Sequence, residues 1–211
     1  MWNAVDRNKA LAALVLFLCL AGAGCRAEPA TLKIGLVAPF EGRDRAVGYD
    51  AVYAARLAVR EINGSGGVAG HAIEVVALDD RGDEELARHA AASLVIDPAV
   101  IAVAGHWLPE TTTAARALYA ENGLALIILG LEPFETLDAR RLPEHFHRRY
   151  EEVTPFDEVA GPYAGATYDA FYLIFSALEL AETSGEISRE SVAVSLQGLQ
   201  YAGVTGTVFQ P

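Results

Sequence analysis

Side chains that could bind a ligand stand directly after short apolar runs in this 211-residue sequence. Each run is followed by a polar loop and then, in most cases, by a segment whose apolar residues have helical spacing, which is the order of a parallel α/β sheet. The carboxyl ends of parallel strands share one edge, and the ligands of open α/β sheets bind there. We therefore expect a small-molecule site where four loops meet, at residues 39–47, 79–83, 106–112 and 130–134.

Eight side chains are candidates for ligand contact at that edge. Trp107 offers a flat face for stacking, and the guanidinium of Arg43 can hold an anion. Each also has a purely structural interpretation: Trp107 can cover the sheet edge, Arg43 can lie in a solvated loop, and the threonines can begin a helix. The set is Phe40, Glu41, Arg43, Trp107, Thr111, Thr112, Glu132 and, on a later helix, Tyr163.

No pattern of a catalytic or metal site is found. The pair Asp79-Asp80 resembles the acidic pair of receiver domains, but an acidic strand end that opens a helix at its positive pole is the simpler interpretation. On a helix, His145 and His147 point to different sides, which disfavours chelation of a metal ion. Nucleophile elbow, phosphate loop and cysteine nucleophile are all absent from the sequence. We therefore expect neither an enzyme nor a bound cofactor.

The composition is that of one acidic domain. Hydrophobic residues make up 52% of the chain and charged residues 21%, and the formal net charge is -12. Because sequence-independent binding to nucleic acid needs a basic face, this balance excludes that class of partner. The length supports one ordinary domain or two very small ones.

The N-terminal residues have the pattern of an export signal. Arg7 and Lys9 precede an apolar run at 10–21, and small residues then lead to Cys25. The pattern predicts a signal peptide over residues 1–25, with Cys25 as the site of lipidation, followed by a tether at 26–32. Simple secretion with cleavage after Ala27 is the alternative. In both cases we expect an exported protein in the periplasm or at the cell surface, and in the first case a lipid anchor in the membrane.

The remaining segments predict an α/β fold. Apolar periodicity, Asn-Gly and Asp-Pro turns and a serine cap define the elements. The expected strands lie at 33–38, 72–78, 100–104 and 124–129, with a closing strand within 201–211, and the expected helices lie at 48–63, 83–96, 111–121, 160–184 and 188–197. We expect a single doubly wound, mostly parallel sheet of about five strands with helices on both faces, and we expect Glu61 to point outward from the first helix.

One segment carries a family resemblance. The run REINGSGGVAGHAIEVVALDD, from Arg60 to Asp80, resembles the type I periplasmic binding proteins, in the branch that binds leucine, isoleucine and valine. The resemblance covers about 34–138 and 145–210, and every matched piece belongs to the first of the family's two lobes. It implies that residues 33–211 form a single lobe, in which a short link at 131–142 stands where the chain would cross into the second lobe.

The resemblance implies a solute-binding protein that serves an ABC importer, with an ABC permease and a small-molecule solute as partners. It also places Pro109 where relatives have a serine and Glu132 where they have a threonine, both of which grip the carboxylate of the amino acid. Proline removes the hydroxyl and the N–H donor, and a glutamate repels a carboxylate, so we expect weak binding. The alternatives are a protein-interaction or dimerisation domain, with a second copy as homodimer mate, and a truncated, non-functional remnant.

Overall fold

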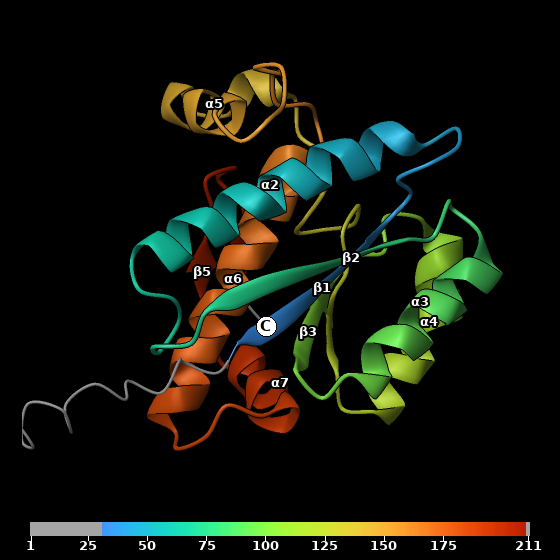
Figure 1. The fold of residues 1–211 in the computed structure, drawn as a ribbon, viewed down its shortest axis with the longest axis vertical. Coiled ribbons are helices and arrows are strands. Elements are labelled where there is room, and N and C mark those ends of the chain that lie inside the picture. Colours follow the sequence, from blue (N-terminus) through green and yellow to red (C-terminus); the bar gives the residue numbers. More distant parts are fainter. Residues whose placement is uncertain (1–30, 210–211) are drawn as a thin grey trace, which may run out of the picture. The chain divides into compact units, whose positions relative to one another are not determined.

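The computed structural model describes residues 31–209, so the predicted signal peptide, Cys25 and most of the predicted tether lie outside the described residues. Four parallel strands form one sheet in the order β2-β1-β3-β4 (Figure 1). They are β1 (Leu32–Ala38), β2 (Ile73–Asp79), β3 (Val100–Ala104) and β4 (Ala125–Ile127). The first strand begins one residue earlier than predicted, because Leu32 already belongs to β1.

Helices cover both faces of this sheet, as the sequence predicts. On one face lie α2 (Arg45–Gly64), α6 (Ala164–Thr183) and α7 (Arg189–Gln197) (Figure 1). The other face carries α3 (Glu84–Ile96) and α4 (Pro109–Glu121). A short helix, α5 (Glu144–Glu151), packs against α2 and follows a single 3-10 turn at Ala139–Arg141. No helix among residues 31–209 is both long and apolar enough to cross a membrane.

The sheet is central because β1 is buried on both sides. Ile34, Leu36 and Ala38 face the cluster of α2, α6 and α7, whereas Val37 faces the cluster of α3 and α4. Side chains alternate along a strand, so a continuous apolar run is what a strand covered on both faces requires. The prediction that the long helix at 160–184 shares a sheet face with the helix at 48–63 is confirmed, because α6 packs along α2.

The end of the described chain differs from the expected closing strand. Residues Tyr201–Ala202 (β5) and Val208–Phe209 (β6) form a small antiparallel hairpin and do not join the main sheet. The carboxylate of Asp169 on α6 holds this hairpin, accepting the N–H groups of Val204 and Thr205 at 2.8 and 3.0 Å. The hydroxyl of Thr205 also donates to it, at 2.5 Å. The N–H groups of Val204 and Thr205 thus donate to Asp169, so they are not available to pair with a neighbouring strand of the main sheet.

Two helices begin earlier than predicted. The first helix starts at Arg45 rather than at residue 48, and α4 starts at Pro109 rather than at Thr111. Proline is favoured in the first helical turn, because its missing N–H group would have no partner there. Pro109, which the resemblance places at the position of the relatives' carboxylate-binding serine, is therefore the first residue of α4.

The prediction that Glu61 points outward is wrong. Its carboxylate accepts hydrogen bonds from Tyr168 and Tyr172 of α6, at 2.6 and 2.9 Å, and forms an ion pair with Arg149 of α5 at 2.6 Å. The side chain of Glu61 is only 22% exposed. Position 61 faces outward on an isolated helix, but α5 and α6 bring three donors to that side. Glu61 thus joins three helices.

Glu61→Ala is expected to lower the free energy of unfolding by about 1–3 kcal/mol, because it leaves two tyrosine hydroxyls and a guanidinium without their charged acceptor. Urea denaturation followed by circular dichroism measures this change. Glu84→Ala is the matched control, since its ion pair with Arg88 is exposed on α3 and should change stability by less than about 0.5 kcal/mol. Equal losses in the two variants would contradict a joining role for Glu61.

Candidate functional site

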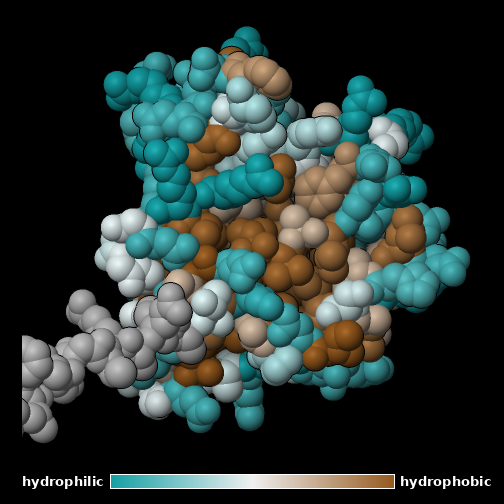
Figure 2. Space-filling model, in the orientation of Figure 1, coloured by the Kyte–Doolittle hydropathy of each residue, from teal (hydrophilic) through white to brown (hydrophobic). Residues whose placement is uncertain are grey.

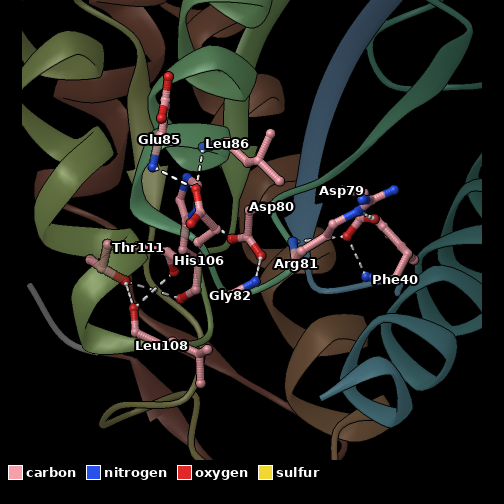
Figure 3. Close-up of polar contacts among 12 residues, drawn as sticks. Phe40, Asp79, Asp80, Arg81, Gly82, Glu85, Leu86, His106, Leu108 and Thr111 are labelled. Carbon is pink, nitrogen blue, oxygen red and sulfur yellow. Dashed lines mark hydrogen bonds and ion pairs between the residues drawn. The ribbon is translucent and has the colours of Figure 1, made fainter. Parts of the chain in front are cut away.

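The expected site edge exists: the loops after β1 and β2 meet where these strands end. Asp79 closes β2 and accepts the N–H groups of Phe40 and Arg81, at 2.7 and 2.9 Å (Figure 3). The guanidinium of Arg81 then reaches Glu41, at 2.6 Å. Two candidates, Phe40 and Glu41, are therefore held by the neighbouring loop, and the charge of Glu41 is balanced by Arg81.

A buried carboxylate joins the loop after β2 to the loop after β3. Asp80 accepts from the Nδ1 atom of His106 at 2.8 Å and from the N–H of Gly82 at 3.0 Å (Figure 3). Because Nδ1 faces a carboxylate, we assign the ring proton to it, which leaves Nε2 to accept from the hydroxyl of Tyr119 at 3.2 Å. Burial, with the charge of Asp80, raises the pKa of Tyr119, so its hydroxyl stays a donor. All three side chains are buried.

Thr111 and Thr112 lie in the first turn of α4 and point inward. Their hydroxyls donate to one carbonyl, that of Leu108, at 3.1 and 2.9 Å, and Thr112 also reaches the carbonyl of His106 at 3.3 Å. Both side chains are buried. In this arrangement their hydroxyl protons are committed to the backbone, so a ligand contact through them requires the loop to change.

Two aromatic candidates are brought together. The rings of Trp107 and Tyr163 pack edge to face, with centroids 5.2 Å apart, which joins the loop after β3 to the start of α6. Trp107 also lies against Gly130 of the loop after β4, where a Cβ atom would approach the Trp107 carbonyl to 2.7 Å. Trp107 is 6% exposed and its Nε1 atom has no hydrogen-bond partner among residues 31–209, whereas Tyr163 is half-buried.

The last two candidates lie apart from this pair. The side chain of Arg43 is 91% exposed and contacts only its neighbour Asp44 among the ion pairs found in residues 31–209. Glu132 is exposed and lines an apolar groove of about 330 Å³ beside β4, together with Leu126, Phe134 and Phe209. The structure thus places one candidate in solvent and one at the sheet border.

The sequence analysis singled out Asp79 and Asp80 as an acidic strand end but did not predict the contact between Asp80 and His106. Asp80 and His106 follow two strands that flank β1, so their proximity could have been inferred from the strand order and the burial of both strand ends. Asp50 was also missed. Burial raises its pKa to about 6, and the charge of Glu158 adds to this rise, against the opposing N–H groups of Tyr163 and Gly161. A carboxylate in the first turns of an amphipathic helix has no sequence signal that separates it from a surface residue.

The buried polar side chains Asp80, His106 and Tyr119 are hydrogen-bonded to one another, whereas Glu41, Arg43 and Arg81 are exposed. Among residues 31–209, no group of three or more histidine, cysteine or acidic side chains could hold a metal ion. An open parallel sheet whose strand-end loops gather side chains at one edge belongs to the class of α/β proteins that bind ligands beyond the carboxyl ends of their strands.

The family comparison agrees with that class. The sequence profile described as periplasmic binding protein matches residues 31–147, more than half of the chain. The chain therefore belongs to the periplasmic binding protein family.

Curated relatives match part of this chain. A leucine-, isoleucine-, valine-, threonine- and alanine-binding protein of Pseudomonas aeruginosa is 32% identical over 138 residues, which is 64% of this chain and 34% of the relative. The Leu/Ile/Val-binding protein of Escherichia coli is 28% identical over 136 residues, which is 63% of this chain and 34% of the relative. The chain thus spans about a third of the length of these relatives.

Solved structures share the fold. A branched-chain amino acid transporter substrate-binding protein of Streptococcus pneumoniae, in complex with isoleucine, superimposes with a TM-score of 0.66 at 16% identity, over 84% of this chain and 91% of the other. A fatty acid ABC transporter substrate-binding protein of Thermomonospora curvata superimposes with a TM-score of 0.72 at 13% identity, over 86% of this chain and 84% of the other. At such identities the likeness shows the fold alone.

His106→Ala is expected to lower the free energy of unfolding by about 3–5 kcal/mol, because it leaves the buried Asp80 carboxylate without its main donor. Tyr119→Phe removes one hydroxyl and should cost about 1 kcal/mol. The control is His89→Ala on the exposed face of α3, which should change stability by less than about 0.5 kcal/mol. Chemical denaturation of the three variants measures this series, and a loss at His106 no larger than that at His89 would contradict the assignment.

Proposed function

We propose that this chain is an extracytoplasmic solute-binding lobe related to the substrate-binding component of a branched-chain amino-acid-type ABC importer. Its role is binding rather than catalysis. The observation that carries this proposal is the convergence of the four loops at the carboxyl edge, with Trp107 and Tyr163 in contact there. The names of the relatives support an amino acid or another small solute as ligand and an ABC permease as partner.

The carboxylate grip of the amino-acid-binding relatives is weakened in this lobe. Pro109 has neither hydroxyl nor N–H, and it begins α4. The threonines that could replace the missing hydroxyl donate to Leu108 instead. Glu132 adds a negative charge to the same edge. Each of these features opposes an α-carboxylate at the strand ends.

We expect leucine, isoleucine and valine to bind the purified protein with Kd no better than about 1 mM, which corresponds to about 4 kcal/mol of binding free energy. One lobe contacts the ligand from one side and leaves its other side in water, so the polar contacts are weak. Isothermal titration calorimetry measures this affinity. A micromolar Kd for any of the three would show that the strand-end loops rearrange into a carboxylate grip.

A protein-interaction domain is the second candidate, and the two borders of the sheet favour it. Apolar side chains gather over β2 on the face shown in Figure 2, where Val75, Val76 and Leu78 are half-buried and Ala77 is exposed. At the other border, β4 is flanked by the apolar groove. Unpaired strand edges with apolar surroundings are surfaces on which another chain can add. Sedimentation of the calorimetry sample separates the two functions, because a dimer at micromolar concentration would favour the second.

Export is the part of this proposal that concerns the residues before 31. We infer from the sequence that the chain is processed at Cys25 and anchored by a lipid. Intact mass of the membrane fraction should show a diacylglyceryl-modified Cys25, and Cys25→Ala should release the protein from membranes, whereas Cys19→Ala in the apolar run is the matched control and should not. If the Cys25→Ala protein still fractionates with membranes as the unchanged protein does, the lipid anchor is contradicted, but secretion is not.

A further inference from the structure

The start of α6 rests on a carboxylate from α2. Oδ2 of Asp50 accepts the N–H of Tyr163 at 3.3 Å, and Tyr163 is the residue that caps α6. Gly161 lies so close that a Cβ atom there would collide with the Asp50 carboxylate. The carboxylate therefore packs directly on the backbone that leads into the helix, and a larger residue at position 161 would displace it.

The same backbone carries one half of the aromatic pair at the strand ends. Tyr163 is held by Asp50 through its N–H, and its ring packs on Trp107 with centroids 5.2 Å apart. Trp107 in turn lies against Gly130 of the loop after β4. A movement of the Tyr163 backbone thus reaches the aromatic surface of the site through two contacts.

We propose that Asp50 is a positioning residue of the strand-end site: its charged carboxylate fixes the start of α6 and so the Tyr163–Trp107 pair, and neutralisation of that carboxylate loosens the pair. This inference rests on the proposed function only in so far as it takes the strand-end edge to be the solute site. The loosening of the Tyr163–Trp107 pair does not itself need a ligand. A hydrogen bond to a charged carboxylate is about twice as strong as one to a neutral carboxyl group. Loss of the charge therefore weakens the bond that holds Tyr163.

The groups around Asp50 allow this change at moderate acidity. Burial raises the pKa of Asp50 to about 6, Glu158 of the loop before α6 raises it further, and the N–H groups of Tyr163 and Gly161 oppose the rise. From α5, the hydroxyl of Tyr150 donates to the Asp50 carbonyl at 3.4 Å, and Tyr53 lies one turn further along α2, edge to face with Tyr150. Burial raises the pKa of Tyr150, so its hydroxyl stays neutral in this pH range, and Glu158 is the charged neighbour that acts on Asp50.

The fluorescence of Trp107 tests the proposal without a ligand. The sequence has two tryptophans, so the full chain is studied with Trp2→Phe, which leaves Trp107 as the reporter. We expect a sigmoidal change in its emission between pH 4.5 and 8, with a midpoint near pH 6. Asp50→Asn keeps the shape and removes the charge, so it should show the low-pH emission throughout. A transition that persists unchanged in Asp50→Asn, or no transition in the parent chain, would overturn the proposal.

Two further variants separate positioning from a general effect of acid. Glu158→Gln removes the neighbouring charge and should move the midpoint to lower pH, whereas Glu84→Gln on the exposed face of α3 should leave it in place. Circular dichroism confirms that each variant is folded. An unmoved midpoint in Glu158→Gln, or an equal shift in Glu84→Gln, counts against Asp50 as the titrating group.

Stability gives a second measurement with a defined sign. Because the folded protein binds the Asp50 proton more tightly than the usual pKa of 3.8 allows, the ionised carboxylate costs stability as the pH rises from 4 through 6. Asp50→Asn should therefore raise Tm above pH 6, with no gain near pH 4; a lower Tm at both would contradict this. If sedimentation finds a dimer at micromolar concentration while the fluorescence transition is lost in Asp50→Asn, the solute-binding function fails and the positioning role stands.

Discussion

Four buried or partly buried carboxylates join the elements of the described fold, and each is met by donors from a different element. Asp80 joins two strand-end loops through His106, Asp169 holds the terminal hairpin, Glu61 joins α2 to α5 and α6, and Asp50 holds the start of α6. A carboxylate out of water is costly unless hydrogen-bond donors surround it. In this acidic chain, that requirement fixes how the elements meet around the sheet.

This constraint also shapes what the strand-end edge can offer a solute. Thr111 and Thr112 donate to a backbone carbonyl, and Asp79 accepts the N–H groups of its neighbours, so these groups are already engaged. The side chains of Arg43, Glu41 and Glu132 are exposed, and Tyr163 is half-buried.

Much of the fold could be predicted because its signals are local. A continuous apolar run marks a strand that is buried on both faces, and Ile34 to Ala38 is such a run. Glycine and proline punctuation marks the ends of helices, so the number and order of the strand–helix units follow from the chain alone. The final segment is different: residues 201–209 have the composition of a strand, but their polar groups are taken by Asp169, which lies more than thirty residues earlier.

Local sequence patterns are sufficient to predict the α/β class, the four parallel strands, the loops that reach the carboxyl edge and the family. The contacts of the candidate side chains depend on the tertiary structure: Trp107 contacts Tyr163, and Glu41 pairs with Arg81, whereas Arg43 lies apart in solvent. The tertiary structure also decided that Glu61 and Asp50 are partly buried carboxylates rather than surface residues. The physical reason is that periodicity reports which side of a helix is apolar, whereas the burial of a polar side chain depends on donors supplied by elements about a hundred residues away.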